Sequence, residues 1–458
     1  MHGPGRTRRS FLRTVAGATA GALAAPTIAP ASALGLGVTP PSERVELELI
    51  GCGGRGMHEG RMYAASDACQ VVAVCDPQKD RRTQAKAIFE KLYTQRQPGG
   101  ASHRGVKAYN DFRDLLQRED IDAVHNATPD HWHVPITIAA VRAGKDVHTE
   151  KPLGVSIEQD LAARAAVRKH ERIFQYGAER RSTPDARHAI ELVVNGRIGK
   201  VHTVWVICPH SFSGGSPEPV LPVPPGFDFD LWLGPAPEAP FCRDRCLIKN
   251  SRNGIFHILD YAIGFIAGWG AHPLDQVQWW ADNAGMTIPV EYGGTGTIPQ
   301  QGLFDVVTHW DMHCRYQDGV RMRFLDDQTA KKYPEIPGIR DRADAATFVG
   351  SEGWISVSYR GVRSHPESLL ESKIGPDEVR LPESRSHQLS WIDSIKKRQD
   401  PVGNIESAVR SDLVSHLCEI AIRTGRSIRW DPTAETIVGD EEARKRMSRP
   451  MRHPWTLK

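Results

Sequence analysis

The sequence lacks the features that mark membrane-spanning and nucleic-acid-binding proteins. Beyond its N-terminal segment, no stretch reaches the ~18 uninterrupted apolar residues that a membrane-spanning helix needs, so we predict no stable membrane span. Positive charge forms no stripe of the kind that holds a phosphate backbone. Residues 1–33 carry four arginines and no acid, and their removal changes the formal charge from +3 to −1. We therefore predict no nucleic-acid partner.

Cysteine is also sparse, and its spacing is uninformative. The chain has eight cysteines, of which Cys242 and Cys246 stand four residues apart. No second pair with the spacing of zinc ligands accompanies them. Several of the others fall in apolar runs, where cysteine packs as a small hydrophobic residue. We predict structural thiols, no disulfide framework and no metal site.

The N-terminal segment has the organisation of an export signal. Residues 8–12, RRSFL, resemble the twin-arginine motif, a weakly hydrophobic stretch follows over residues 15–25, and residues 31–33, ASA, offer a cleavage site. The alternative is a basic tail without a targeting role. We predict that residues 1–33 are a signal peptide, that the twin-arginine translocase recognises it, and that the mature protein is periplasmic or secreted.

Strands and helices alternate from residue 44 to residue 150. The expected strands are residues 45–50, 70–75, 123–127 and 146–149, and the expected helices are residues 57–65, 80–93, 110–118 and 133–143. This alternation predicts a doubly wound parallel sheet with right-handed crossovers. We expect residues 44–170 to form a dinucleotide-binding domain.

The pattern changes in residues 171–431. The expected strands are residues 201–207, 305–316, 320–324 and 354–358, and the expected helices are residues 183–195, 386–396 and 405–423. A Pro- and Gly-rich connection over residues 209–232 is expected to lie on the surface. The fold class is α/β: an N-terminal parallel sheet plus a C-terminal α/β domain with a large open, mostly antiparallel sheet. A tail over residues 432–458 ends in an aromatic segment that we expect to dock.

The sequence GCGGRG at residues 51–56 follows an expected strand and opens an expected helix, as in a dinucleotide-binding turn. Gly51 permits the tight turn, Gly53 lets backbone N–H groups approach a pyrophosphate, and Gly56 allows close helix–strand packing. The phosphates would lie at the positive end of the helix. Gly54 and Arg55 belong to the same predicted contact.

Asp76 ends the second expected strand, twenty residues beyond Gly56. A carboxylate at this position accepts hydrogen bonds from ribose hydroxyls and repels a 2′-phosphate, which favours NAD over NADP. Lys79, Arg81 and Arg82 lie nearby and keep NADP open as the alternative, although such residues are more typical of a solvated helix face.

Three further segments resemble signatures of the Gfo/Idh/MocA oxidoreductases: NATPDHWH at residues 126–133, EKP at 150–152, and GWGAHPLDQVQW at 268–279. The resemblance extends from Val45 to the SIRWD at 427–431. It implies an N-terminal Rossmann domain and a C-terminal α/β domain whose open sheet often mediates oligomers. We therefore expect a homo-oligomer.

The resemblance implies two catalytic residues. Lys151 would lie near the nicotinamide, where an ammonium can stabilise an alkoxide and take part in proton transfer; the peptide before Pro152 is expected to be cis. His272 would exchange a proton with the substrate hydroxyl. The family commonly pairs this histidine with an aspartate four residues earlier, where this chain has Gly268. Two carboxylates are candidates to replace it: Asp260 and Asp275.

Other predicted site residues follow from position. The carboxyl end of the strand at 123–127 belongs to the sheet edge where doubly wound folds bind ligands. The residues expected on the nicotinamide side are Thr128, Pro129, His131 and His133. Glu150 and Lys151 are also predicted to contact the cofactor. The candidates for substrate binding are Arg180, Arg181, Asp260, Tyr261, Trp269 and Asp275. For the arginines the alternative is an internal salt bridge, and for the aromatic residues it is core packing.

Export constrains the chemistry. Free NAD is not expected to be regenerated outside the cytoplasm, so we predict a tightly bound cofactor that is recycled within one catalytic cycle. The leading hypothesis is an NAD-dependent oxidoreductase that acts on a secondary alcohol of a carbohydrate or polyol. One alternative is NAD-dependent glycoside cleavage, in which transient oxidation permits elimination and the hydride is then returned. The second is a non-catalytic ligand-binding relative.

Overall fold

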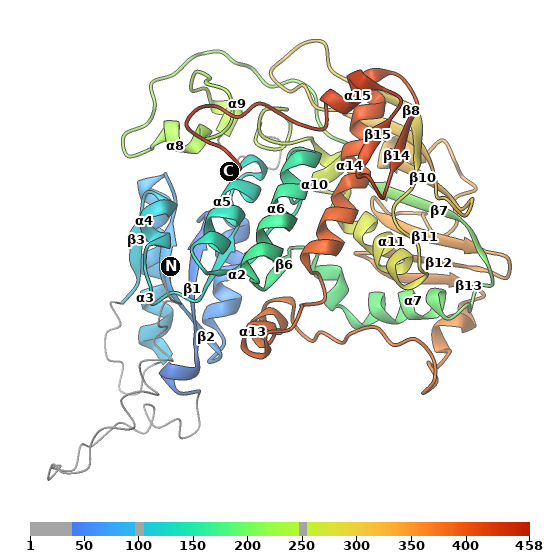
Figure 1. The fold of residues 1–458 in the computed structure, drawn as a ribbon, viewed down its shortest axis with the longest axis horizontal. Coiled ribbons are helices and arrows are strands. Elements are labelled where there is room, and N and C mark those ends of the chain that lie inside the picture. The colour runs from blue at the N-terminus through green and yellow to red at the C-terminus, as the bar shows by residue number, and fades with distance from the viewer. Residues whose placement is uncertain (1–38, 97–104, 247–253) are drawn as a thin grey trace, which may run out of the picture.

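The computed structural model describes residues 39–96, 105–246 and 254–458. The predicted signal peptide at residues 1–33 lies outside these ranges. In the described part of the chain, none of the helices combines the length and apolar character needed to cross a bilayer. Two α/β parts lie side by side, and the second begins after residue 176 (Figure 1). This arrangement confirms the predicted fold class.

The N-terminal part is built on a six-stranded sheet in the order β3-β2-β1-β4-β5-β6, and every neighbouring pair is parallel. The strands are β1 (Val45–Ile50), β2 (Cys69–Cys75), β3 (Lys107–Tyr109), β4 (Ala123–Asn126), β5 (Asp146–Thr149) and β6 (Phe174–Tyr176). The direction of winding reverses between β1 and β4. Their carboxyl ends therefore border the crevice in which doubly wound sheets bind ligands. The sheet extends past the predicted domain end at residue 170.

Helices cover both faces of this sheet (Figure 1). They are α2 (Gly54–Ala64), α3 (Lys79–Arg96), α4 (Phe112–Leu116), α5 (Asp130–Arg142) and α6 (Ile157–His170). Because α2 begins at Gly54, three residues earlier than predicted, the glycine-rich turn itself supplies the first N–H groups of the helix.

The second sheet has nine strands in the order β13-β12-β11-β7-β10-β9-β8-β14-β15. All neighbouring pairs are antiparallel except β7 and β10. The strands are β7 (Val201–Cys208), β8 (Glu291–Thr297), β9 (His309–Arg315), β10 (Arg321–Asp326), β11 (Ala345–Gly350), β12 (Trp354–Ser358), β13 (Gly361–His365), β14 (Ile428–Asp431) and β15 (Thr436–Val438). The sheet thus continues past the predicted domain end at residue 431.

The helices of the second part are α7 (Pro184–Val194), α8 (Phe229–Leu233), α9 (Arg243–Cys246), α10 (Phe265–Gly268), α11 (Ala271–Asn283), α12 (Asp327–Ala330), α13 (His387–Lys397), α14 (Ile405–Thr424) and α15 (Glu441–Lys445). Three short 3-10 helices are η1 (Pro41–Glu43), η3 (Glu179–Ser182) and η4 (Glu367–Glu371). Helices α7, α11 and α14 pack on the second sheet, and α14 also packs on α6. Helix α14 therefore joins the two parts (Figure 1).

The C-terminal tail returns to the first part and docks there, as its aromatic end predicts. The indole of Trp455 packs edge-on against that of Trp132, with centroids 4.7 Å apart, and Arg452 Nε donates to the carbonyl of Gly234 at 2.8 Å.

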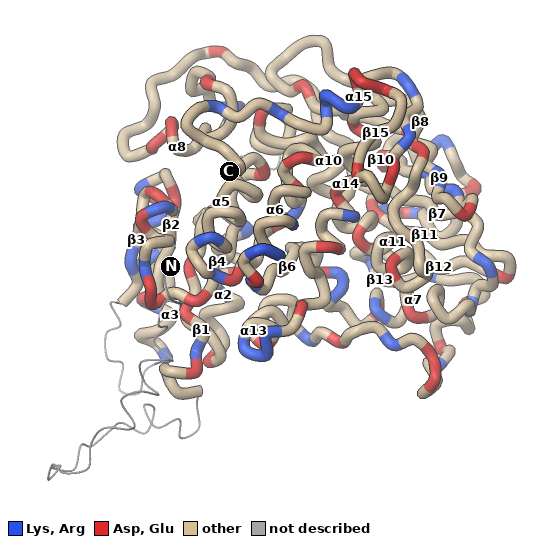
Figure 2. The backbone as a smooth tube through the Cα atoms, in the orientation of Figure 1, with Lys and Arg blue, Asp and Glu red and all other residues tan. Residues whose placement is uncertain are grey.

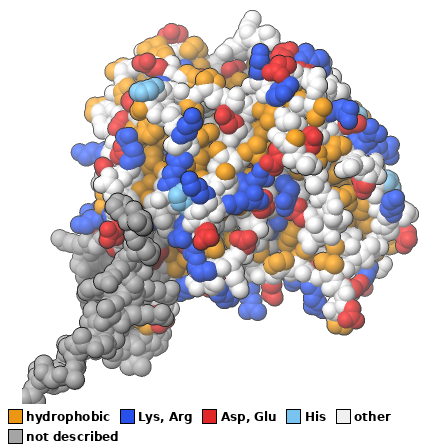
Figure 3. Space-filling model, viewed as in Figure 1, with side chains coloured by type: hydrophobic (Ala, Val, Ile, Leu, Met, Phe, Trp, Pro, Cys, Tyr) orange, Lys and Arg blue, Asp and Glu red, His pale blue; other side chains and the backbone are white. Residues whose placement is uncertain are grey.

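All eight cysteines lie in the described residues, buried and with free thiols. Basic and acidic residues are interspersed along the backbone (Figure 2), and both signs occur together on the face in Figure 3.

Candidate functional site

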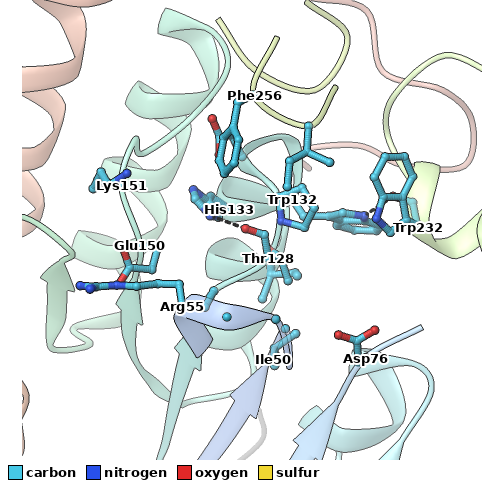
Figure 4. A pocket seen from close by; sticks show the side chains of 18 of the residues that line it. Ile50, Arg55, Asp76, Thr128, Trp132, His133, Glu150, Lys151, Trp232 and Phe256 are labelled. Carbon is cyan, nitrogen blue, oxygen red and sulfur yellow. Dashed lines mark hydrogen bonds and ion pairs between the residues drawn. The ribbon is translucent and has the colours of Figure 1, made fainter. Parts of the chain in front are cut away.

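A cavity of about 520 Å³ lies over the carboxyl ends of β1, β2, β4 and β5 (Figure 4). Its floor includes the glycine-rich turn, Asp76 and the residues after β4 and β5. Its opposite wall comes from the second part of the chain, with Trp232, Trp269, His272 and Tyr359. The site is therefore formed by both parts together.

The three glycines of the turn meet different constraints. Gly51 has φ +92°, and a Cβ there would lie 2.4 Å from the carbonyl oxygen of Ala127. A Cβ on Gly56 would lie 2.0 Å from the carbonyl oxygen of Gly51. At Gly53, by contrast, the nearest described atom to a Cβ is Arg81 Nη1 at 3.7 Å. Gly53 thus borders open space at the start of α2, where backbone N–H groups can hold a phosphate.

Asp76 is buried at the end of β2, and the backbone holds its carboxylate. Oδ2 accepts from Cys52 N–H at 2.9 Å, and Oδ1 accepts from Gln78 N–H at 2.8 Å. Burial raises its pKa, and the charge of Arg81 opposes that rise. Arg81 lines the cavity, whereas Arg82 donates to the Asp76 carbonyl at 3.0 Å. Asp76 therefore stands where a ribose would lie, fixed by the same turn that would hold the phosphates.

Lys151 and His272 line the same cavity. Lys151 Nζ donates to the carbonyl of Gly268 at 2.7 Å, and burial lowers its pKa. The peptide between Lys151 and Pro152 is cis, as expected. Burial also lowers the pKa of His272 well below its usual range, and the Lys151 charge acts in the same direction. His272 is therefore neutral near pH 7 and able to accept a proton.

Tyr359, which no sequence motif predicts, contacts the His272 ring. Its hydroxyl lies 3.0 Å from Nδ1 and 3.4 Å from Nε2, so Nδ1 is the closer partner, and it donates to Glu179 Oε1 at 3.3 Å. Burial acts to raise the pKa of Glu179, but the Arg55 charge lowers it below its usual value, so Glu179 is ionised. Because the hydroxyl has one proton, and Glu179 accepts it, Nδ1–H of neutral His272 donates to the tyrosine oxygen. Nε2 is then left as the proton acceptor.

Arg55 connects the glycine-rich turn to three carboxylates. Its Nε donates to Glu150 Oε1 at 2.7 Å, and Nη2 lies 3.2 Å from Glu179 and 3.0 Å from Glu59. Burial raises the pKa of Glu59 to about 7. The predicted cofactor contacts Arg55 and Glu150 thus face each other across the cavity floor (Figure 4), and Arg55 orders the turn, the EKP segment and η3 together.

Thr128, Pro129 and His133 also line the cavity, as predicted from position. The His133 ring lies between the carbonyls of Thr128, at 2.9 Å, and Pro152, at 2.6 Å, and burial lowers its pKa to about 4. Asp130 lines the cavity as well, and burial raises its pKa to about 8. Its carboxyl group is therefore mostly protonated at neutral pH and can donate to a ligand.

His131 lies outside this cavity. Its Nε2 is 3.1 Å from the carbonyl of Trp232, and its ring packs against Tyr261 with centroids 5.1 Å apart. Successive residues of a helix are about 100° apart around its axis, so two side chains that are two residues apart point about 160° away from each other. His133 therefore turns toward the β4–β5 edge, and His131 turns toward the α8 segment.

The predicted substrate residues separate into two groups. Trp269 lines the cavity. Arg180 is not one of the lining residues but lies behind Tyr359, with its guanidinium 5.5 Å from the centroid of that ring and a hydrogen bond to the Ser358 carbonyl. Arg181 and Asp275 form a buried pair with N–O distances of 2.7 and 2.8 Å, away from the cavity. A buried carboxylate needs such a partner, so Asp275 is engaged and does not reach His272.

Asp260 and Tyr261 also lie away from the cavity. Tyr261 is buried in an aromatic cluster and accepts from Arg245 at 3.0 Å, and Asp260 borders a separate cavity beside the C-terminal tail. Neither predicted carboxylate therefore replaces the one that position 268 lacks. Tyr359 contacts the histidine in its place and in turn donates to Glu179. No spacing in the sequence links Tyr359 to the histidine, because it follows β12, 87 residues beyond His272.

Family models match both parts of the chain. Residues 46–178 match the NAD-binding Rossmann fold of the oxidoreductase family (GFO_IDH_MocA), and residues 202–457 match the C-terminal alpha/beta domain of that family (GFO_IDH_MocA_C2).

Curated relatives match part of the chain. A glycosyl hydrolase family 109 protein of Shewanella baltica is 30% identical over 167 residues, which is 33% of this chain and 35% of that protein. An alpha-N-acetylgalactosaminidase of Shewanella oneidensis is 31% identical over 167 residues, with the same shares. The alignments thus span about a third of these relatives.

Solved structures share the fold over most of the chain. An aldose-aldose oxidoreductase from Caulobacter crescentus, complexed with glycerol, has a TM-score of 0.58 at 17% identity and covers 84% of this chain and 99% of its own. A scyllo-inositol dehydrogenase from Lactobacillus casei, with bound NAD(H) and scyllo-inositol, has a TM-score of 0.54 at 15% identity, with 84% and 99% covered.

Proposed function

The chain belongs to the Gfo/Idh/MocA oxidoreductase family, and from this premise we propose that it is an NAD-dependent enzyme for a carbohydrate or polyol. The reaction oxidises a secondary alcohol of the substrate. The observation that carries the proposal is the placement of Lys151 and neutral His272 on one cavity, opposite a glycine-rich turn with open space at Gly53.

The residues present fit a dinucleotide. The backbone N–H groups at the start of α2 and the carboxylate of Asp76 suit its phosphates and ribose. NAD, when bound, supplies the hydride acceptor. Lys151 Nζ stabilises the alkoxide that develops on the substrate oxygen, and His272 Nε2 accepts the hydroxyl proton. Tyr359 and Glu179 hold the histidine in that tautomer, and protonated Asp130 donates a hydrogen bond to a bound ligand.

A second candidate function is glycoside cleavage through transient oxidation of the sugar. Two observations favour it: the curated relatives are named as glycosyl hydrolases of family 109, and one as an alpha-N-acetylgalactosaminidase. In this cycle the same two residues act twice, first when the carbinol is oxidised and again when the carbonyl is reduced. The cofactor returns to its starting state in each cycle, as in sugar-to-sugar oxidoreduction.

We also propose that the protein is exported by the twin-arginine route and works outside the cytoplasm. The RRSFL segment, the weakly hydrophobic stretch and the ASA site support this. A redox-neutral cycle suits that location because no pool of free NAD is needed. The proposal therefore includes tight retention of the cofactor and, from the family's open sheet, a homo-oligomer.

The first test measures the cofactor. The mature protein is purified without added nucleotide and then denatured, and NAD(H) and NADP(H) are measured in the released material. We expect about one NAD(H) per chain, because a cofactor that dissociates slowly stays bound during purification. A protein free of both nucleotides would contradict the bound-cofactor proposal.

The second arm of this test measures turnover on aldoses, polyols and aryl glycosides. Replacement of Lys151 by methionine keeps most of the length of the side chain and removes its charge. We expect turnover to fall by about 10²- to 10⁴-fold while the NAD(H) content stays unchanged. The matched control is Lys91→Met, an exposed lysine near the end of α3. Equal turnover in Lys151→Met and wild type would exclude Lys151 as a catalytic residue.

A further inference from the structure

Helices α6 and α14 bring three potential metal ligands together behind the EKP segment. One ligand atom from each of Asp160, Asp412 and His416 lies within 4.8 Å of the other two. Asp412 and His416 stand four residues apart on one face of α14, and Asp160 comes from the facing α6. Their exposed fractions are 0%, 0% and 4%, so solvent cannot neutralise their charges.

Asp160 is the unusual member of this group. Within the described residues, neither of its oxygens has a hydrogen-bond partner, and neither has Nε2 of His416. These two groups nevertheless approach to 3.2 Å, between Nε2 and Oδ2. Arg164, one turn along α6, forms its ion pairs with Glu406 and Glu435. A buried carboxylate without a donor is costly, and the cluster therefore needs a proton or a cation between its members.

The geometry points to a cation, and we propose that Asp160, Asp412 and His416 bind one divalent transition metal ion of the zinc class. Two ligand atoms that are each about 2.0–2.1 Å from a tetrahedral ion lie about 3.3 Å from each other. The distance of 3.2 Å between His416 Nε2 and Asp160 Oδ2 is close to this value. One imidazole nitrogen with carboxylate oxygens is a donor set that suits zinc. Two ligands that stand four residues apart on one helix point in the same direction, and the third ligand comes from a second helix, so all three can reach one ion.

Asp412 is already oriented for this role. The Tyr176 hydroxyl donates to one of its oxygens, and the Leu153 N–H donates to the other. Such second contacts fix ligating carboxylates. Leu153 lies two residues after Lys151, so the ion would stabilise the segment that carries the catalytic lysine. The role assigned to the metal is structural, and the metal content is measured independently of turnover.

The test measures metal in the whole mature chain. The protein is produced without a polyhistidine tag in zinc-supplemented medium and washed with chelator, and its metals are quantified by mass spectrometry after denaturation, because the ligands are buried. We expect about one zinc per chain. Asp160→Asn and His416→Gln should each reduce the content at least tenfold, whereas His202→Gln, an exposed histidine on β7, should retain it.

A second measurement does not depend on variants that fold. Anomalous diffraction at the zinc edge, on crystals of the wild-type protein, should place the ion between Asp160 and His416. A metal located at other residues would overturn the proposal. So would a metal-free wild-type protein whose unfolding temperature does not change on zinc addition, and the cluster would then hold a shared proton instead.

Discussion

This chain has glycine at position 268. The family resemblance predicts an aspartate there, four residues before His272, as the partner of that histidine. The nearest described atom to a Cβ built on Gly268 would be Phe265 Cδ1, at 3.8 Å, so a Cβ fits there without strain. The Gly268 carbonyl instead holds Lys151. Tyr359 and Glu179 orient the histidine from another element, and the orientation of His272 therefore depends on the hydroxyl of Tyr359.

Tyr359→Phe tests this dependence. The variant keeps the ring against His272 and removes the contact to Nδ1, so the imidazole loses its fixed tautomer. We expect kcat to fall roughly 10- to 100-fold, a typical loss for an orienting partner, with KM little changed. Steady-state kinetics provide the measurement. Addition of Gly268→Asp to this variant should recover part of kcat, which a general loss of packing would not allow. Failure of both effects would remove Tyr359 from the site.

The pH dependence of the wild-type enzyme follows from the lowered pKa of His272. A base must be deprotonated, and a pKa below 6.5 keeps this imidazole neutral as the pH falls through 6.5. Activity should therefore persist at pH 6 and be lost only at lower pH. The pH dependence of activity is measured in the same way for Tyr359→Phe, and this profile serves as the control for the tyrosine experiment. A wild-type acid limb at or above pH 6.5 would contradict a neutral, buried His272.

At the scale of elements, the sequence predicts those whose pattern is local. Strand β5 and strand β12 have the predicted bounds, because each is a short β-prone run between turn residues. Strand β8, with the sequence EYGGTGT, was not predicted, since glycine is unfavourable in strands. Its strand conformation comes from pairing with β9 and β14. Pairing with strands far away in the sequence determines that these residues form a strand, and no local pattern of the sequence predicts it.

The same distinction applies to the candidate site. Residues in contiguous motifs, such as Gly51 and Lys151, were predicted to line it and do so. Glu179 and Tyr359 come from η3 and from the turn after β12, so only the folded chain brings them to His272. Asp275 was predicted because it follows His272 by three residues. Its burial beside Arg181 depends on how α11 packs, which sequence spacing does not specify.

The C-terminal tail is the element whose contribution can be measured most directly. Trp455 packs against Trp132, which lines the cavity, and the Arg113 guanidinium lies 4.9 Å from the centroid of the Trp455 ring. Trp455→Ala removes a half-buried indole, so we expect the free energy of unfolding to fall by about 1–3 kcal/mol. NAD(H) should also dissociate faster. Urea denaturation and nucleotide release provide the readouts.

The control for this experiment is Thr456→Ala, an exposed neighbour in the same tail. It should leave both the unfolding free energy and the release of nucleotide within error of wild type. If Trp455→Ala behaves like this control, the tail is attached to α5 too weakly to support the cavity wall.

The cavity depends on the whole molecule, because its floor and its opposite wall come from different parts of the chain. Arg55 reaches across the boundary to Glu179, and α14 packs on both α6 and the second sheet. Separate domains would therefore not reproduce the site. A protein that must be folded before its cofactor is enclosed is suited to export in the folded state.

The export prediction is tested on the precursor that carries residues 1–33. Arg8→Lys combined with Arg9→Lys should leave the precursor in the cytoplasm, because the twin-arginine pair is the recognised feature, whereas Arg6→Lys with Arg13→Lys keeps the same charge and should be exported normally. Cell fractionation followed by immunoblotting measures both. The exported wild-type protein, once denatured, should release about as much NAD(H) per chain as the cytoplasmic precursor, because a cofactor that dissociates slowly stays with the folded chain during transport. Normal export of the Arg8/Arg9 variant would exclude the twin-arginine route, and an exported protein without nucleotide would show that the cofactor is exchanged after export.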